Sequence, residues 1–577
     1  MGPSVRAELT SLKNGLSRAF WLWRACEHRQ LTLWHCVEYW AEQRPRARAL
    51  SDESESINWS TLREQTQMLA SVLRDSGVKD GTRVALIADN SVKLIVSLFA
   101  IQLAGGVPIP LDSWASSEWL RETLGELEPG LALIESSKDA EHLGSLKSCR
   151  TLTMRELWQR TSKPNAYPHR GRSGQRPFAI LVTSGTTGKP KSVVISNTRC
   201  VLSGYGIAGF CLALTEKDVL FCALPLSHAT ALMTGLCASM VSGCAFVMRR
   251  RWVSDEFWRD VAAEKATCLL YVGELVRRLL SAPQRPEENA HRLRVAYGNG
   301  MALDVWHRFQ ARFGIREILE FYGATELPLA MVNLAQRPGY IGHSLWSTLS
   351  PWRVVVRDAE TGELVRNSAG KCIDCEPEQP GELVLLTRPF GNFRFSDSLA
   401  PSTDHEHMQR VSDVAHPGDE GLRTGDIVVR DREGYVKFED RTFEVFRQQG
   451  RNVSVAQLVR ALRAFEGVAA IGVTHLTLRH YDGQLGLAVL VPSSAFSLDG
   501  LKEFYQSIPR YARPRFLRLT NALRVNRGLK FDHAFYRAEG LDPERSTQER
   551  IFVYSNGAFE PISVEILAKL SLGRFRF

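Results

Sequence analysis

Short apolar runs alternate with helix-like segments over the first three quarters of the chain. Residues 83–111 form the clearest case, because an apolar strand is followed by a segment of helical pattern and then by a second strand. Asn90 or Ser91 is suited to cap the helix, and Gly105–Gly106 is suited to end it. Further runs of strand length lie at residues 131–134, 179–182, 244–248, 268–272 and 294–298. This alternation predicts α/β layers built on largely parallel sheets.

The pattern changes near residue 440. The elements predicted beyond it are a helix at 455–465, strands at 471–476 and 486–492, and a second helix near 499–507. We therefore predict an α/β chain of two domains. Residues 1–439 form a large N-terminal domain of layered sheets and helices, and residues 440–577 form a small α+β domain.

The composition is that of a globular enzyme in a reducing compartment. Of the 577 residues, 44% are hydrophobic and 23% are charged, which is ordinary for such a protein. The formal net charge of +9 is small for this length, so it suits a polyanionic cofactor or anionic lipid and does not indicate a nucleic-acid partner. The eleven cysteines are scattered rather than spaced as a disulfide framework, and we expect a cytoplasmic protein.

The sequence shows neither a zinc pattern nor a membrane-spanning run. Cys372 and Cys375 form one C-x-x-C pair, but a zinc ribbon needs a second pair, which the chain lacks. No run approaches the roughly 20 apolar residues of a membrane span. The segment "LSRAFWLWRAC" at 16–26 is suited either to lie on a membrane surface as a short amphipathic helix or to pack on its own domain, so a peripheral membrane contact stays open.

The stretch "AILVTSGTTGKPKSVVISN", residues 179–197, places hydroxyls, glycines and lysines between two apolar runs. Glycines let a backbone come close to a phosphate, while N–H groups, hydroxyls and lysines donate to its oxygens. The ATPase loop needs four residues between its first glycine and its Gly-Lys pair, but Gly185 and Gly188 have two between them. The spacing excludes that loop and favours a phosphate site of another kind over a surface linker. A second glycine pattern, "GYGIAG" at 204–209, has no strand before it, and we interpret it as a helix-packing feature.

Four more motifs follow this stretch along the chain. With "TSGTTGKPKSV" at 183–193, the set comprises "LPLSH" at 224–228, "FYGATE" at 321–326, "RTGD" at 423–426 and "GLK" at 528–530. In kind and in order, the set resembles the adenylate-forming superfamily of acyl-CoA synthetases and related ligases. Within it, the segments at 271–309 and 511–518 resemble the fatty acid transport protein and very-long-chain acyl-CoA synthetase family. The resemblance runs from about residue 31 to residue 545.

The resemblance implies a large adenylation domain and a small, mobile C-terminal domain that turns between two poses, with a pivot near 440–444. The residues that it assigns to the phosphates of ATP are Thr183, Ser184, Gly185, Thr186, Thr187, Gly188, Lys189 and Lys191. Glu326, with a loop hydroxyl such as Thr186, would hold Mg²⁺. Lys530 on the small domain would reach the α-phosphate and the substrate carboxylate during adenylation.

The same resemblance places the adenine and the acyl-adenylate. Tyr322 would offer its flat face to adenine, with Gly323, Ala324 and Thr325 beside it. The plainer interpretation of these residues is a turn. Gly298, in "GNG", would let the backbone pass close to the acyl-adenylate because it has no side chain.

Three further residues have two interpretations each. Asp426 would accept both ribose hydroxyls, which suits the paired oxygens of a carboxylate, or it is an aspartate in a turn. Arg441 would reach the same nucleotide, or it is a surface arginine. His228 would line the acyl site, or it is a structural histidine at the end of an apolar strand.

The implied activity is the ATP-dependent activation of a fatty or similarly apolar carboxylic acid to acyl-AMP, followed by thioester formation with CoA. ATP, Mg²⁺ and CoA are the implied cofactors. The chain departs from the family pattern at Phe443, Glu444 and Gln457, in the region that bears on the acceptor. Two alternatives stay open: an acyl-AMP ligase that delivers to a carrier-protein thiol or an amine, and a degenerate homologue that binds acyl groups or nucleotide without turnover.

Overall fold

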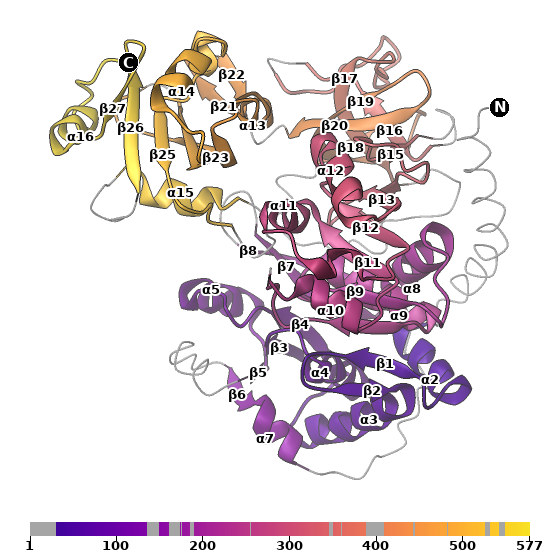
Figure 1. The fold of residues 1–577 in the computed structure, drawn as a ribbon. Helices are drawn as coiled ribbons and strands as arrows, with labels where there is room; N and C mark the ends of the chain where they lie inside the picture. The colour runs from indigo at the N-terminus through magenta and orange to yellow at the C-terminus, as the bar shows by residue number, and fades with distance from the viewer. Residues whose placement is uncertain are drawn as a thin grey trace. The chain divides into compact units, whose positions relative to one another are not determined.

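The computed structural model shows a mixed α/β chain, which confirms the predicted fold class (Figure 1). It describes residues 31–135, 149–160, 174, 176–184, 190–253, 255–344, 350–358, 361–387, 409–441, 445–449, 451–481, 483–525, 531–541 and 549–577. The chain forms two compact units, the first within residues 1–349 and 387–406, the second within 350–386 and 407–577. A domain boundary at residues 439–440 stays a prediction.

The first unit is built around an eight-stranded sheet in the order β14–β13–β12–β11–β9–β10–β1–β2. Its strands are β1 (Arg48–Ser51), β2 (Ser56–Asn58), β9 (Val219–Cys222), β10 (Ala245–Met248), β11 (Cys268–Val272), β12 (Val295–Asn299), β13 (Glu317–Tyr322) and β14 (Met331–Val332). The six strands from β13 to β1 are parallel, and the short strands β14 and β2 pair antiparallel at the edges. The apolar runs predicted as strands at 244–248, 268–272 and 294–298 are confirmed as β10, β11 and β12.

A second, parallel sheet of this unit has the order β4–β3–β5–β6. Its strands are β3 (Arg83–Ile87), β4 (Val107–Leu111), β5 (Leu131–Ile134) and β6 (Arg150–Thr153). Helix α4 (Val92–Ala104) joins β3 to β4. It is buried because its surface is apolar almost all round. The side chain of Ser91 caps it by accepting from the N–H of Leu94, and Gly105, with φ of 100°, ends it. The strand–helix–strand prediction for 83–111 is confirmed.

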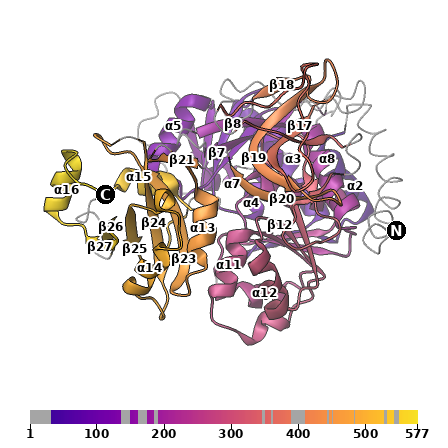
Figure 2. The same ribbon diagram turned by 90° about the horizontal axis from the view of Figure 1, so that it is seen from above.

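The other helical segments of the first unit connect and cover these sheets (Figures 1 and 2). They are α2 (Leu33–Gln43), α3 (Trp59–Asp75), α5 (Ser117–Leu127), α7 (Met154–Gln159), α8 (Asn197–Tyr205), η1 (Gly206–Cys211), η2 (Thr230–Leu236), α9 (Cys237–Ser242), α10 (Phe257–Ala263), α11 (Gly273–Ser281), η3 (Pro286–Asn289) and α12 (Leu303–Phe313). At Gly204 of α8, a Cβ would lie 2.6 Å from the carbonyl oxygen of Cys237 on α9. The helix-packing interpretation of the second glycine pattern is confirmed at this position.

A hairpin of β7 (Pro177–Ser184) and β8 (Pro190–Ser196) packs against the second sheet. Ile180 and Val182 of β7 belong to one apolar cluster with Ile87 of β3 and Ile109 of β4. Helix α8 begins directly after β8, where the side chain of Ser196 accepts from the N–H of Arg199. The hairpin and α8 are therefore one continuous, anchored segment.

A buried asparagine joins the two sheets of the first unit. Asn90 follows β3, and its Nδ2 donates to the carbonyl oxygens of Leu224, after β9, and Arg249, after β10, at 2.8 and 3.1 Å. Its Oδ1 accepts from the N–H of Leu226 at 2.9 Å. Because every polar atom of the side chain is used, Asn90 fixes the "LPLSH" segment relative to β3. The helix cap is thus Ser91, the second of the two residues predicted for it.

The second unit has an antiparallel sheet and a mixed sheet. Within this unit, the antiparallel sheet contains β16 (Trp352–Val355), β17 (Pro380–Leu386), β19 (Glu420–Arg430) and β20 (Tyr435–Arg441), with β18 (Arg410–Ser412) beside β19. The mixed sheet has the order β23 (Val468–Leu476), β24 (Leu485–Pro492), β25 (Phe516–Leu519), β26 (Arg550–Ser555) and β27 (Ala558–Pro561). Its β24–β25 pair is parallel and the other pairs are antiparallel.

Helices cover both faces of the mixed sheet. The remaining elements are the hairpin β21 (Val445–Gln448) and β22 (Arg451–Ser454), and α13 (Val455–Arg463), α14 (Leu498–Tyr505), η5 (Arg510–Ala512), α15 (His533–Glu539) and α16 (Val564–Ser571). Leu462 of α13 and Leu501 of α14 pack in one apolar cluster with Leu490 of β24. Tyr536 of α15 packs in another with Val489, the next residue of that strand. The helices and strands predicted for residues 455–507 are confirmed.

No helix among the described residues is long and apolar enough to cross a membrane. The segment at 16–26, for which a membrane-surface contact stays open, lies outside those residues. Cys372 and Cys375 are buried in the second unit and carry free thiols.

Candidate functional site

The hydroxyl- and glycine-rich stretch begins at the end of β7 and reaches the start of β8, which are paired with each other. In the register of that hairpin, Thr183 pairs with Lys191 and Ser184 pairs with Pro190. Between these pairs, and outside the described residues, come Gly185, Thr186, Thr187, Gly188 and Lys189. The prediction that strands flank the stretch is confirmed, and its contact with phosphate stays a prediction.

The "GNG" turn after β12 needs glycine for reasons of packing. Gly298 lies so close to β11 that a Cβ would be 2.1 Å from the carbonyl oxygen of Tyr271. Gly300 has φ of +84°, a conformation that L side chains rarely adopt. A Cβ on Gly273, at the start of α11, would lie 1.9 Å from the carbonyl oxygen of Gly300. The fold itself therefore requires these glycines, and the closeness of Gly298 to an acyl-adenylate stays a prediction.

Glu320 ties the "GNG" turn to the neighbouring strand. It lies on β13 opposite Gly298 of β12, and 3% of its surface is exposed. Its Oε1 accepts hydrogen bonds from the hydroxyl of Tyr271 at 2.6 Å and from the N–H of Met301 at 3.0 Å. Its Oε2 accepts from the N–H of Gly300 at 3.0 Å. One carboxyl group thereby joins β11, β13 and the turn after β12.

Burial dominates the electrostatics of this group. It raises the pKa of Glu320 to about 8, although the hydrogen bonds from Tyr271, Met301 and Gly300 act in the opposite direction. Burial, followed by the negative charge of Glu320, raises the pKa of Tyr271 well above its ordinary value. Burial thus favours the protonated form of the carboxyl, which serves as a hydrogen-bonding centre for three donors.

Tyr322 ends β13 and leads into the loop 323–326. Its side chain is buried, and its backbone pairs with that of Met331 in β14. The loop residues that follow are partly exposed. A Cβ on Gly323 would have Ala330 as its nearest neighbour, at an ordinary contact distance of 3.6 Å, so the loop is uncrowded there. The adenine contacts of Tyr322 and of the loop stay a prediction.

A buried arginine on α8 holds this loop. The side chain of Arg199, a residue that the sequence did not indicate as functional, is 5% exposed. Its Nη2 donates to the carbonyl oxygens of Thr325 and Leu327, each at 2.6 Å. Burial lowers the pKa of Arg199 to about 10, and the charges of Cys200 and Glu326 partly offset that effect. The backbone on both sides of Glu326 is therefore fixed by one guanidinium group.

The "LPLSH" block brings His228 near a buried aspartate. The hydroxyl of Ser227 donates to Oδ1 of Asp112 at 2.6 Å, and Nε2 of His228 lies 4.0 Å from Oδ2 of Asp112. Asp112 follows β4, and the side chain of His228 is 32% exposed. The π-helix η2 begins two residues later, and such helices are frequent at functional sites. A partly exposed imidazole beside a carboxylate is suited to a ligand contact, and an acyl contact of His228 stays a prediction.

The "RTGD" block of the second unit is organised by Glu382 of β17. Arg423 donates from Nε and Nη2 to the two carboxylate oxygens of Glu382, at 3.0 and 2.7 Å, and this bridge raises the pKa of the guanidinium. Asp426 is buried on β19, and its backbone pairs directly with that of Arg441 on β20. Residues paired in this way occupy neighbouring positions. The register thus brings together the two predicted nucleotide residues of this unit.

The predicted catalytic Lys530 lies outside the described residues, as do residues 442–444, where the chain departs from the family pattern. Gln457 is exposed in the first turn of α13, and its N–H donates to the capping hydroxyl of Ser454 at 3.0 Å. The role of Lys530 stays a prediction.

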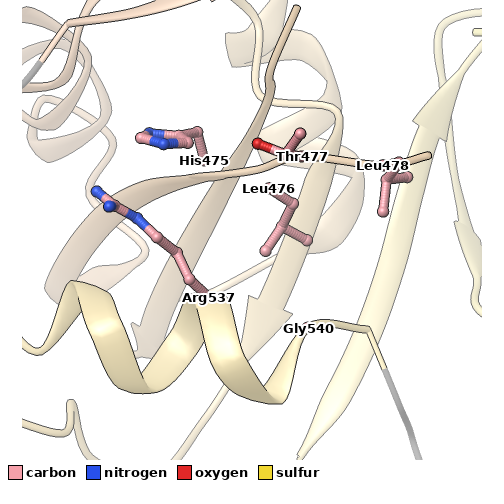
Figure 3. Close-up of a pocket in the computed structure, with 6 residues that line it drawn as sticks. All are labelled: His475, Leu476, Thr477, Leu478, Arg537 and Gly540. Atoms are coloured by element: carbon pink, nitrogen blue, oxygen red, sulfur yellow. The ribbon is translucent and has the colours of Figure 1, made fainter. Parts of the chain in front are cut away.

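The second unit also contains a cavity of about 250 Å³ between the end of β23 and α15 (Figure 3). It is lined by His475, Leu476, Thr477, Leu478, Arg537 and Gly540. Figure 3 shows the side chains of His475 and Arg537 close together on the same side of the strand. Burial, followed by the positive charges of Arg537 and His533, lowers the pKa of His475 to about 4. None of the predicted site residues that the structure describes lines this cavity.

Among the described residues, no group of three or more His, Cys, Asp or Glu side chains is placed to hold a metal ion. Mg²⁺ is commonly bound by one or two carboxylates together with phosphate oxygens and water. Glu326 supplies one partly exposed carboxylate beside the end of β13. It therefore fits a magnesium ion that is carried by a polyphosphate, whereas Thr186, the second predicted ligand, lies outside the described residues.

Sequence reasoning missed three residues that organise the site. An acid in the middle of the apolar strand "EILEFY" was the signal for Glu320, and the acid after glycine in "PGELVLL" was the signal for Glu382. Arg199 gave no such signal, because an arginine in the first turn of a helix is usually a solvated residue.

The sequence profile described as AMP-binding enzyme matches residues 37–388. Mouse long-chain fatty acid transport protein 1 is 29% identical over 569 residues, which cover 93% of this chain and 86% of the relative. Human long-chain fatty acid transport protein 3 is 32% identical over 407 residues, which cover 69% of this chain and 58% of the relative. The chain thus spans less than two thirds of that human relative.

Solved structures share the fold at lower identity. ATP-bound MatB from Rhodopseudomonas palustris is 21% identical, with a TM-score of 0.71, and the match covers 88% of this chain and 99% of that one. The O-succinylbenzoate coenzyme A synthetase from Bacillus subtilis in complex with ATP and magnesium ion is 22% identical, with a TM-score of 0.68, over 86% of this chain and 98% of that one. These likenesses establish the fold.

The raised pKa of Glu320 predicts a pH-dependent stability. Folding favours the protonated form, so the free energy of unfolding is highest below the ordinary glutamate pKa and falls as the pH rises towards 8. The fall is on the order of 1.4 kcal/mol for each pH unit crossed. Glu320→Gln should remove this contribution, as measured by urea unfolding between pH 5 and pH 8.

Glu317→Gln is the matched control, because Glu317 is exposed at the start of the same strand. The control should keep the pH dependence of the wild-type chain. If the free energy of unfolding of the Glu320→Gln variant changed with pH as steeply as that of the wild-type chain, the raised pKa of Glu320 would be contradicted.

Proposed function

Because this chain belongs to the AMP-binding enzyme family, we propose that it activates a fatty or similarly apolar carboxylic acid as acyl-AMP and then transfers the acyl group to CoA. The names of its relatives, long-chain fatty acid transport proteins, support the class of acid. A solved structure with the same fold, the O-succinylbenzoate coenzyme A synthetase in complex with ATP and magnesium ion, supports the reaction.

One observation carries the proposal. The "GNG" turn and the "FYGATE" loop follow neighbouring parallel strands, β12 and β13, and so lie at the same edge of the sheet. Open α/β sheets bind their ligands at the carboxyl ends of their strands. Glu320 fixes the first of these segments and Arg199 fixes the second. A rigid, uncrowded site at this edge is what a nucleotide needs.

The first step forms acyl-AMP. A carboxylate oxygen of the acid attacks the α-phosphorus of ATP, and the bond from that phosphorus to the pyrophosphate oxygen breaks. Negative charge builds up on the leaving pyrophosphate, so fixed donors and cations must face it. In our proposal the hairpin turn from Thr183 to Lys191 supplies them.

The other predicted residues hold the rest of the nucleotide. Tyr322 would stack on adenine, and Asp426 would accept from the ribose hydroxyls beside Arg441. Glu326 and Thr186 would hold Mg²⁺, which neutralises phosphate charge when it is bound. Lys530 would neutralise charge on the α-phosphate and the substrate carboxylate.

The second step transfers the acyl group. The thiolate sulfur of CoA attacks the carbonyl carbon of acyl-AMP, and AMP leaves with the electron pair of the broken carbon–oxygen bond. His228 would line the acyl site in this step, next to Asp112. We propose a cytoplasmic location, and the small positive net charge would suit a peripheral contact with anionic lipid.

The purified chain should exchange labelled pyrophosphate into ATP in the presence of a fatty acid and should form an acyl thioester when CoA is added. The measurement is a panel of carboxylic acids of increasing chain length, scored first for exchange and then for thioester. Exchange without thioester formation would indicate that the acceptor is a carrier-protein thiol or an amine instead of CoA. A chain that binds acids or ATP without any exchange would be the degenerate homologue.

Lys530→Ala should slow the exchange reaction by about 10²-fold or more, because a charge that acts in the transition state is lost. Lys569→Ala is the control, since Lys569 is an exposed lysine of the same unit that pairs with Glu565 at 2.6 Å. The control should keep the wild-type rate. A Lys530→Ala variant with an unchanged exchange rate would refute the assignment.

A further inference from the structure

Arg199 forms hydrogen bonds with the backbone on both sides of Glu326. Its Nη2 donates to the carbonyl oxygens of Thr325 and Leu327, the residues before and after that glutamate. Both bonds measure 2.6 Å, and hydrogen bonds from a charged donor are the stronger ones. The carboxylate of Glu326 therefore extends from a backbone that cannot shift freely.

The other two nitrogens of Arg199 form no hydrogen bond with the residues that the structure describes. Nε and Nη1 are buried and have no hydrogen-bond acceptor among the described residues. By contrast, Arg249 bridges to Asp260 at 2.7 Å, and Arg312 forms an ion pair with Glu288. A buried charge without such a partner costs stability, so a purely structural role explains Arg199 poorly.

Arg199 also stands at the junction of two predicted ligand-binding segments. It lies in the first turn of α8, directly after β8, and β8 contains Lys191 at its other end. The side chain of Ser196 caps this helix by accepting the N–H of Arg199 itself. A single stretch, from Lys191 to Arg199, thus links the hairpin turn to the loop of Glu326.

We propose that Arg199 is a positioning residue that sets the carboxylate of Glu326 for the magnesium ion carried by ATP. The inference rests on the proposed function, because it assumes that the chain binds ATP with Mg²⁺. Arg199 acts through the backbone of residues 325–327 and through its charge, which attracts that of Glu326. It fixes the metal-binding loop relative to the phosphate-binding hairpin.

The test measures how much Mg²⁺ tightens ATP binding, by calorimetric titration of the full chain with ATP in Mg²⁺ and in EDTA. Arg199→Lys keeps the charge but loses the planar fork, and Arg199→Gln loses the charge. In both variants the affinity for ATP in EDTA should stay within about twofold of the wild-type value. The factor by which Mg²⁺ raises that affinity should fall by about tenfold or more. The second variant keeps the test available if the first does not fold.

A double-mutant cycle separates positioning from general stability. Glu326→Gln should lose the same gain, and adding Arg199→Lys to it should cost nothing further. Arg312→Lys is the matched control: Arg312 also donates to two carbonyl oxygens, those of Leu280 and Ala282, and its variant should lower the unfolding temperature while keeping the gain.

Two results would overturn the inference. In the first, the Arg199 variants keep the full gain from Mg²⁺; in the second, their losses add to that of Glu326→Gln. Either result leaves the proposed function standing. A wild-type chain that binds no ATP, or whose ATP affinity is unaffected by Mg²⁺, would instead contradict the proposed function and this inference with it.

Discussion

The architecture of the site depends on the buried carboxyl group of Glu320, which accepts hydrogen bonds from neighbouring donors. Glu320 accepts from one hydroxyl and two backbone N–H groups at the ends of adjacent strands. Removing the bond from Tyr271 or Met301 would leave a buried donor unpaired, which costs more than the bond contributes. The "GNG" turn is therefore held in one conformation, with glycines where the strands approach too closely for a Cβ.

The same arrangement recurs at three other candidate segments of the chain. Arg199 holds the loop around Glu326, Asn90 holds the "LPLSH" segment, and Glu382 holds the "RTGD" block. In each case one buried polar side chain fixes the backbone of a loop whose own side chains are proposed to contact ligands. This division suits catalysis, because groups that are fixed beforehand need not reorganise during the reaction.

The sequence predicted most of the fold, since apolar periodicity and helix caps are local signals. The βαβ unit at 83–111 and the strands at 268–272 and 294–298 were confirmed. It also singled out the motifs that are proposed to contact ligands, but not the residues behind them. Arg199 is 126 positions from Thr325 in the chain, and no local pattern shows that a helix arginine will meet a distant carbonyl. Contacts of that kind arise only from tertiary packing.

Hydrogen exchange of the full chain, with and without ATP and Mg²⁺, tests the central claim most directly. If the nucleotide binds at the ends of β12 and β13, amides in residues 298–301 and 320–327 will exchange more slowly when it is present. Protection confined to other regions, such as the cavity beside His475, would show that the nucleotide binds elsewhere. That result would contradict a nucleotide site beside the segments that Glu320 and Arg199 hold.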